Sequence, residues 1–179
     1  GWHVTPLPGG AEVLTTGYIT RIGDVGGDPW FEVFPDDLVP ASPGVWDSEQ
    51  RRALWLARRH PGRALISVDA DGQFESVELD WAGDRQELDG LAQQASGRLV
   101  TIRSEVDEQW NPIDGSSTGI VFEPTGAIAA TFPVEPGSSL GGYDPSGRFL
   151  IYVAGDGAVR WQGPGGGGEL GQGYLFASW

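Results

Sequence analysis

GYDPSGRFLIYVAGDGAVRW, residues 142–161, contains the clearest structural signal in this 179-residue chain and predicts a β-hairpin. Its first turn, residues 144–147, combines a proline, which presets φ, with a glycine, which tolerates positive φ. An apolar run, residues 149–153, follows, and such a run is typical of a strand covered on both faces. The Gly155-Asp-Gly157 turn then reverses the chain. Residues 158–161 alternate in polarity, as in a strand with one face more exposed to solvent. We therefore expect this hairpin to be a central part of the core.

The composition also favours a β-rich fold. The chain has 29 Gly, 13 Pro and 8 Trp, which fits many short strands joined by tight turns better than a helical bundle. Its length suffices for one domain with its own core, so residues 1–179 are expected to form a single β-rich domain. No apolar run approaches the roughly 20 residues of a membrane-spanning helix, and no cleavable signal peptide is recognisable.

The charge and cysteine content narrow the classes of function. The formal net charge of -14 argues against non-specific nucleic-acid binding, which depends on basic residues that release counterions, and it favours a neutral or basic partner. All 11 basic residues are arginine. Because there is no cysteine, a disulfide framework, a thiol nucleophile and a thiolate metal site are excluded.

One segment, residues 47–60, predicts a helix inserted among the strands. Asp47 with Gln50 three residues later has the arrangement of a capping box, and Pro61-Gly62 would stop the helix. The next segment without a strand pattern, residues 84–95, is expected to be a short helix or polar connection weakened by Gly90.

The predicted helix would surround Trp55 with arginines. Residues 51–63 contain five arginines and no acid, whereas the rest of the chain has six arginines against 25 acids. On a helix the neighbours of Trp55 are three and four positions away, and these positions are occupied by Arg51, Arg52, Arg58 and Arg59. An indole framed by guanidinium groups is typical of a binding hot spot. The alternative is that these arginines only pair with acidic residues of the chain or of a second copy.

Hairpin-like patterns recur outside residues 142–161. Gly-Arg followed by four apolar or β-branched residues begins at Gly62, Gly97 and Gly147, at spacings near the roughly 40 to 50 residues of a propeller blade. The glycine run 163–168 is expected to be a flexible or ligand-approaching loop. Further strands are expected at residues 12–14, 18–22, 30–34, 64–68, 74–81, 99–102, 118–122, 128–132 and 174–176.

The segment Tyr143-Asp-Pro-Ser-Gly-Arg148, with Asp156-Gly157 after the strand, resembles the blades of secreted TolB-like and WD-like β-propellers. These blades have an Asp-Pro-Ser/Asp-Gly-Arg turn before an apolar strand and an Asp-Gly turn after it, and residues 61–81 match the pattern in part. The resemblance implies a mostly β, antiparallel, propeller-like fold of about four blades, or a propeller fragment, with the one inserted helix. A two-sheet β-sandwich is the alternative. The resemblance also implies a location outside the cytoplasm, although a cytoplasmic one stays open.

No catalytic or metal-binding motif stands out. Asp69-Ala-Asp71-Gly72 begins like a hard-cation loop but lacks the later acidic ligand, so we expect a hairpin turn, with no metal site and no cofactor. Only His3 and His60 could be the base of a nucleophilic triad, and no Gly-x-Ser-x-Gly elbow is present. Trp30 and Trp110 lie beside loop breakers and are candidates for a sugar-stacking or partner-binding rim.

These observations favour a non-catalytic, extracytoplasmic binding module that recognises a protein or glycan partner and neither binds nucleic acid nor spans a membrane. One alternative is a glycan-processing hydrolase with two carboxylates in an acidic cleft, since 25 acidic residues offer many pairs. Another is a small acidic inhibitor or immunity protein that masks a basic partner.

Overall fold

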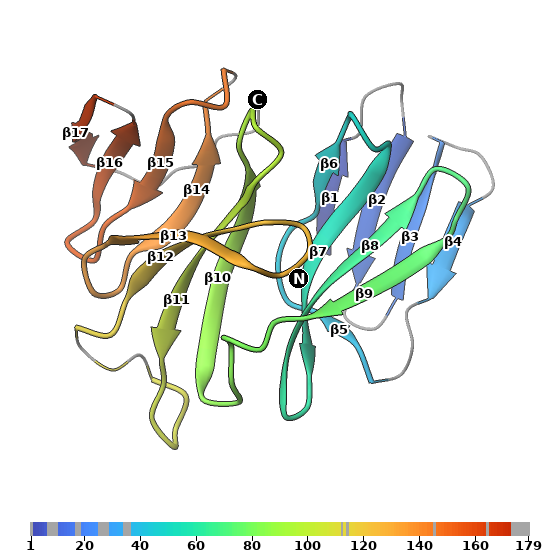
Figure 1. Cartoon of the computed structure of the whole chain (residues 1–179), viewed down its shortest axis with the longest axis horizontal. Helices are drawn as coiled ribbons and strands as arrows, with labels where there is room; N and C mark the ends of the chain where they lie inside the picture. Colours follow the sequence, from blue (N-terminus) through green and yellow to red (C-terminus); the bar gives the residue numbers. More distant parts are fainter. Residues whose placement is uncertain are drawn as a thin grey trace. The chain divides into compact units, whose positions relative to one another are not determined.

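The computed structural model describes residues 2–6, 11–16, 19–24, 29–33, 37–111, 113, 115–144, 146–163 and 165–172, with side chains described from residue 37 onward. Within these ranges the regular secondary structure consists of β-strands, and no helix occurs. Accordingly, no helix that could cross a membrane is present in the described part of the chain. The chain divides into two compact units, residues 1–84 and 85–179, and each unit contains two antiparallel sheets (Figure 1).

The first sheet of unit 1 is a meander in which each strand pairs with the next one along the chain. Three of its strands confirm the predictions for residues 12–14, 18–22 and 30–34, with shifted bounds. Its strands are β1 (Trp2–Pro6), β2 (Ala11–Thr16), β3 (Ile19–Asp24) and β4 (Pro29–Val33).

The second sheet of unit 1 has the order β5-β7-β8-β9, with β6 also on β7. Its strands are β5 (Val39–Pro40), β6 (Val45–Asp47), β7 (Arg52–Arg59), β8 (Gly62–Asp69) and β9 (Phe74–Glu78). Because β5 and β6 pair with successive parts of β7, they act as one interrupted strand. At the interruption Leu56 N–H donates a hydrogen bond of 3.0 Å to Ser42 Oγ, and Ala41 N–H donates one of 2.7 Å to Leu56 O.

The helix predicted for residues 47–60 is wrong. Asp47 does accept hydrogen bonds from the N–H groups of Glu49 and Gln50, both 3.1 Å, but these residues form a turn rather than the start of a helix. The following residues are β7, which pairs with β8 along its whole length. Residues 53–57 are all buried, so both faces of the strand are covered. A short unbroken apolar run does not distinguish such a strand from a buried helix.

The β7–β8 hairpin is the best-buried part of unit 1. Trp55 and Ile66, which are directly opposite each other, are fully buried in a cluster with Ala53, Ala57 and Val68.

The hairpin of residues 142–161 is confirmed as β15 and β16, but its predicted burial is wrong. Its run 149–153 is mostly half-buried, and Phe149 is 36% exposed.

Unit 2 consists of two four-stranded meanders. The first has β10 (Gln86–Gln93), β11 (Leu99–Glu105), β12 (Thr118–Phe122) and β13 (Ile128–Pro133). The second has β14 (Ser139–Tyr143), β15 (Leu150–Val153), β16 (Ala158–Gly163) and β17 (Gly166–Gln172).

Two predictions for unit 2 are wrong, and one lies outside the described residues. Within the segment 84–95, predicted as a short helix or polar connection, residues 86–93 form strand β10, with a bulge between Asp89 and Ala92 and with Gly90 at φ +67°. Most of the glycine run 163–168 belongs to strands β16 and β17, which pair with each other. The strand predicted at residues 174–176 lies outside the described residues.

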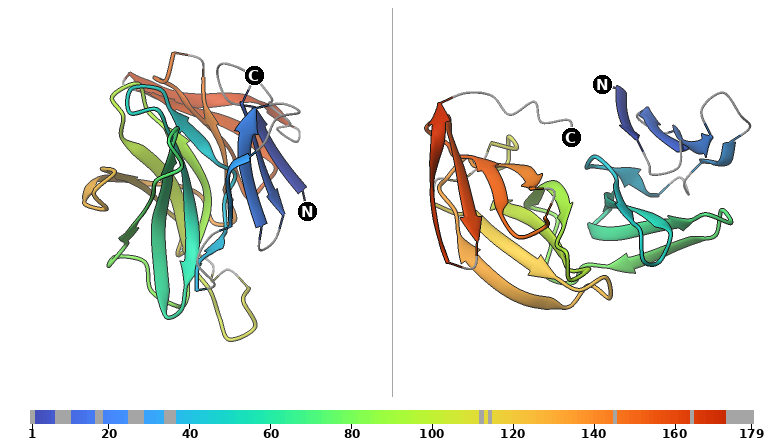
Figure 2. Two further views of the ribbon diagram at one scale, coloured as in Figure 1. Left: turned by 90° about the vertical axis from the view of Figure 1, so that its right-hand side faces the viewer. Right: turned by 90° about the horizontal axis from the view of Figure 1, so that it is seen from above.

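The two sheets of unit 2 lie side by side, with β14 next to β10 (Figure 2). Val100 and Val121 of the first sheet form a buried cluster with Leu150 of the second. Leu140 N–H donates a hydrogen bond of 2.9 Å to Asp89 Oδ2. Consecutive antiparallel meanders of this kind are the blades of a β-propeller. The predicted fold class, mostly β and antiparallel with propeller-like blades, is therefore confirmed without its inserted helix.

Candidate binding surface

The loop between β11 and β12 contains a tight turn, residues 107–111, that is closed by its own backbone and by one carboxylate. Asp107 N–H donates to Asn111 O at 2.9 Å, and Trp110 N–H donates to Asp107 O at 3.1 Å. Asp107 Oδ1 accepts hydrogen bonds from the backbone N–H groups of Asn111, 2.9 Å, and Gln109, 2.8 Å. Hydrogen bonds, chiefly the one from the Asn111 N–H group, hold the pKa of Asp107 below its usual 3.8. The Asp107 carboxylate is therefore ionised at neutral pH.

The same backbone pattern recurs in five other described turns, and the comparison shows that Trp110 occupies a position where those turns have glycine. In each turn the fourth residue has positive φ and its N–H group donates to the carbonyl three residues earlier. In the five other turns this residue is Gly72, Gly97, Gly126, Gly147 or Gly157. Trp110 occupies the position at φ +64°. The left-handed region costs a residue with a Cβ about 1 to 2 kcal/mol, a cost that glycine avoids.

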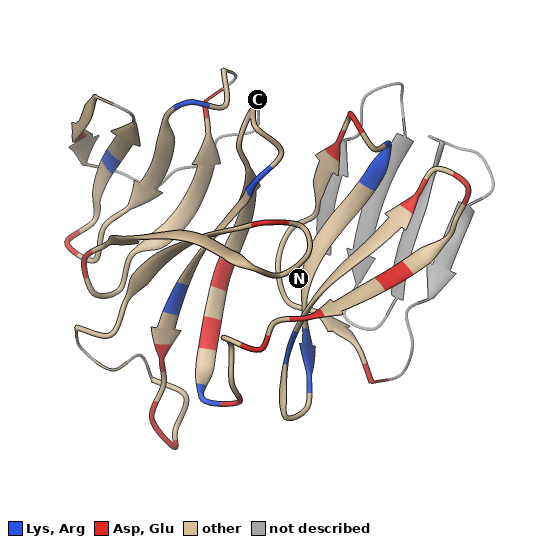
Figure 3. Cartoon of the chain, in the orientation of Figure 1, with Lys and Arg blue, Asp and Glu red and all other residues tan. Residues whose placement is uncertain are grey.

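The strained residue is also exposed. Trp110 is 53% exposed and Ile113 is 44% exposed, both in the loop that extends beyond the ends of β11 and β12 (Figure 1). A hollow of about 410 Å³ beside the turn is lined by Arg85, Gln86, Glu105, Val106, Asp107, Glu108 and Ile113. Its three carboxylates outnumber its single guanidinium, and Figure 3 shows the acidic residues gathered along this loop. The surface thus combines an exposed aromatic ring with negative charge.

This arrangement is suited to binding rather than to chemistry. An exposed indole can take a planar or cationic group on its face, and carboxylates nearby would pair with the same cation. Asp107 is a poor general acid because its hydrogen bonds lower its pKa, whereas a general acid at neutral pH needs a raised one. Among the described residues, no group of three His, Cys, Asp or Glu is placed to hold a metal ion.

The arginine ring predicted around Trp55 does not exist, because residues 52–59 form a strand. Trp55 is fully buried, so its ring offers no contact surface. Arg52 and Arg59 stand at opposite ends of β7, seven residues and therefore about 23 Å apart. Figure 3 shows basic residues at both ends of this strand.

The four arginines of the predicted ring have separate surroundings. Arg52 Nε lies 3.6 Å from an Asp47 oxygen, and Arg59 Nε lies 2.9 Å from an Asp37 oxygen. These contacts match the alternative in which the arginines pair with acidic residues of the chain. Arg51 and Arg58 are exposed, and Arg51 has φ +51°.

The remaining candidates are the two loop tryptophans and the two histidines. Trp110 is the exposed, strained residue described above, whereas Trp30 belongs to β4 in a region where side chains are not described. His60 is exposed and lies 3.3 Å from Asp84, and His3 lies in β1. The loop breakers that follow Trp110 were the sequence signal for this surface, but its positive φ had no signal of its own.

No family model and no curated protein matches the sequence. Solved structures do match. A Bacteroides caccae protein of unknown function superposes with a TM-score of 0.64 at 12% identity, over 95% of this chain and 60% of that protein. Catalytically inactive virginiamycin B lyase from Staphylococcus aureus, with quinupristin, superposes with a TM-score of 0.57 at 10% identity, over 97% of this chain and 70% of the lyase. A luciferin-regenerating enzyme superposes with a TM-score of 0.51 at 12% identity, over 94% of this chain and 62% of that enzyme.

The chain has a β-propeller-type fold. It spans 60% of the length of the Bacteroides protein and 70% of the length of the lyase. At 10 to 12% identity these likenesses concern the fold alone.

Proposed function

We propose that this chain is a non-catalytic binding module of the β-propeller type, in which Trp110 and the carboxylates beside it bind a basic segment of a partner protein. The observation that supports this most directly is the backbone of Trp110, which has positive φ where five equivalent turns have glycine. A bulky exposed residue that costs stability at such a place is typical of a functional site.

The charge of the chain supports a basic partner. A guanidinium or ammonium group over an indole contributes about 0.5 to 2 kcal/mol, and Glu105 would add an ion pair, whereas Glu108 already lies 3.4 Å from Arg85. The net charge of -14 would also steer a basic segment toward the protein from a distance. A small acidic inhibitor that masks a basic protein would use the same surface, so that alternative is one form of this proposal.

A glycan-processing hydrolase is the weaker candidate. Such an enzyme needs a carboxyl group with a raised pKa opposite a second carboxylate, whereas hydrogen bonds lower the pKa of Asp107.

The extracytoplasmic location and the closer kinship to TolB-like propellers belong to the proposal as well. Their support is the turn at Asp144–Arg148, in which Asp144 Oδ1 accepts hydrogen bonds from the N–H groups of Arg148, 3.0 Å, and Phe149, 2.8 Å.

The experiment compares Trp110→Ala and Trp110→Gly with the wild type and with Leu170→Ala, a control that removes another exposed apolar side chain. The probe is a labelled nona-arginine peptide, titrated at low salt by fluorescence anisotropy, because all four proteins have the same net charge. Both Trp110 variants should bind about 5- to 30-fold more weakly, which corresponds to 1 to 2 kcal/mol, and Leu170→Ala should bind like the wild type.

The glycine variant separates a lost contact from a damaged turn. Glycine suits the positive φ, so Trp110→Gly should be more stable than Trp110→Ala by about 1 kcal/mol in urea titration. Equal affinity of the wild type and both Trp110 variants for the peptide would overturn the proposal. Weak binding by the alanine variant alone would show that turn geometry, and not the indole, matters.

A further inference from the structure

The second sheet of unit 2 contains a shallow pocket that the proposed function does not use. The pocket has a volume of about 380 Å³ and lies over β15, β16 and β17. Its main lining residues are Tyr152, Arg160, Trp161, Gln162, Glu169 and the glycines of residues 166–168. The volume is at the lower end of ligand pockets, which occupy about 300 to 1,000 Å³.

Strand register explains the hollow. Tyr152, Arg160 and Glu169 are direct partners on β15, β16 and β17, so their side chains project from the same face of the sheet. Gln162 lies two residues after Arg160 and therefore on that face, but its partner on β17 is Gly167. The missing side chain at Gly167 leaves an open floor between Gln162 and the Arg160–Glu169 pair.

Packing requires the glycines that form this floor. A Cβ atom at Gly167 would lie 2.8 Å from the carbonyl oxygen of Trp161. On the opposite face Gly168 pairs with Trp161, and a Cβ atom there would lie 2.9 Å from Trp161 Nε1. The Trp161 ring is in turn held edge-on to Phe149, with 5.6 Å between ring centroids. The open floor is therefore built into the fold and is not closed by a small rotamer change.

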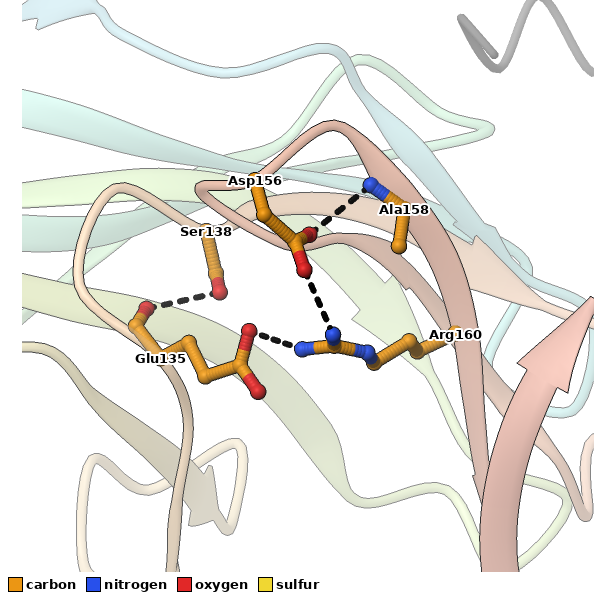
Figure 4. A network of polar contacts seen from close by, with 5 residues as sticks. All are labelled: Glu135, Ser138, Asp156, Ala158 and Arg160. Carbon is orange, nitrogen blue, oxygen red and sulfur yellow. Dashed lines mark hydrogen bonds and ion pairs between the residues drawn. The ribbon is translucent and has the colours of Figure 1, made fainter. Parts of the chain in front are cut away.

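The guanidinium group of Arg160 is held in place before any ligand arrives (Figure 4). Its Nη2 lies 2.7 Å from an oxygen of Asp156, and its Nη1 pairs with the carboxylate of Glu135. Asp156 is itself fixed by the N–H group of Ala158 at 2.9 Å, and Ser138 Oγ donates to Glu135 O at 2.7 Å. Only 20% of the Arg160 side chain is exposed.

The charges around the pocket select against an anion. Glu135, Asp156 and Glu169 supply three carboxylates, whereas Arg160 supplies one positive charge that is already paired. The remaining lining is an amide, a phenol, an indole and glycine backbone. Such a surface offers hydrogen-bonding groups to a neutral polar ligand, and the half-buried ring of Tyr152 lies on the same face of the sheet as Arg160 and Glu169.

We propose that this pocket binds a neutral sugar unit of a glycan. The hydroxyl groups of a pyranose can donate to Glu169 and exchange hydrogen bonds with Gln162, while its C–H face lies against an aromatic ring. The pocket accommodates one or two sugar units. The residues that carry this proposal differ from those of the Trp110 surface, so each proposal can fail without the other.

The test is isothermal titration calorimetry of the full chain with a panel of neutral tetrasaccharides built from glucose, galactose, mannose or N-acetylglucosamine. Glu169→Ala and Tyr152→Ala should each weaken binding at least about 10-fold, and Tyr152→Phe should retain most of it. Leu170→Ala is the matched control, because it is the next residue of β17 and does not line the pocket. A tetragalacturonate should bind more weakly than its neutral counterpart.

Two outcomes would refute the proposal. The first is that no member of the panel binds the wild type at concentrations up to about 10 mM, which corresponds to a binding free energy weaker than about 3 kcal/mol. The second is that Glu169→Ala binds the sugar as well as the wild type does. Since Glu169 is exposed, its removal should leave the melting temperature unchanged, which separates a lost contact from a lost fold.

Discussion

Gly44→Ala should destabilise unit 1 through a single side chain, that of Trp55. Gly44 lies at the interruption between β5 and β6, and a Cβ atom there would lie 2.4 Å from Trp55 Nε1 and 2.8 Å from its Cε2. The φ angle of Gly44 is outside the left-handed region, so alanine suits the backbone. The cost of the substitution is therefore steric.

The magnitude follows from the burial of the indole. Trp55 is fully buried, so its ring has to move by about 1 Å within a close-packed cluster to restore an ordinary contact. Overpacking of this kind costs about 1 to 3 kcal/mol, and alanine returns about 0.4 to 1 kcal/mol by restricting the unfolded chain. The midpoints of these two ranges leave a net loss, so we expect Gly44→Ala to lower the free energy of unfolding by about 1.3 kcal/mol.

A double-mutant cycle assigns this loss to the indole. Trp55→Leu alone should cost about 3 kcal/mol because it leaves a cavity. Adding Gly44→Ala to that variant should raise the free energy of unfolding by about 0.7 kcal/mol, since the atoms that Cβ would meet are gone and only the restriction of the unfolded chain remains. The coupling energy is therefore about 2 kcal/mol. Urea titration followed by far-UV circular dichroism measures all four proteins. A neutral Gly44→Ala, or a loss of the same size in the Trp55→Leu background, would falsify the reasoning.

Two further predictions concern polar groups. Ser42→Ala should cost about 1 to 3 kcal/mol in urea titration, because it leaves the buried N–H group of Leu56 without its acceptor; an unchanged midpoint would mean that this N–H group finds another acceptor. The hydrogen bonds of Asp144, chiefly from the Ser146 hydroxyl and then the Phe149 N–H group, lower its pKa from 3.8 to about 2. Because the folded value is the lower one, this carboxylate stabilises the fold above about pH 5, and the contribution is lost as the pH falls toward 2. Asp144→Asn should therefore be less stable than the wild type at pH 7, with the difference in melting temperature shrinking toward pH 2; a constant difference would show that the charge is irrelevant.

The hairpins could be predicted because turn chemistry is local. Gly72, Gly126, Gly147 and Gly157 each provide a positive φ at the same place in a tight turn, and strands follow on both sides. These short-range patterns were sufficient to predict an antiparallel, blade-like fold. They also selected Trp110, which lies beside loop breakers.

The errors occurred where a local pattern fits two structures. The apolar run 53–57 suits a buried helix or a strand covered on both faces, and Asp47 caps a turn in the same way that it would cap a helix. In β10 the bulge between Asp89 and Ala92 interrupts the alternation that marks a strand. Pairing with β8 and β11, the strands that follow next along the chain, decides both cases, and the local apolar pattern does not encode that pairing.

The tight turns were thus determined by the sequence alone, because neighbouring residues restrict φ and ψ directly. Which side chains are buried was decided only by the tertiary structure, as the two tryptophans show. Trp55 lies among arginines in the sequence yet is fully buried, whereas Trp110 is 53% exposed and has a backbone conformation that normally favours glycine. Burial depends on which strand lies opposite and which face is covered, and these contacts form between residues that no local pattern relates.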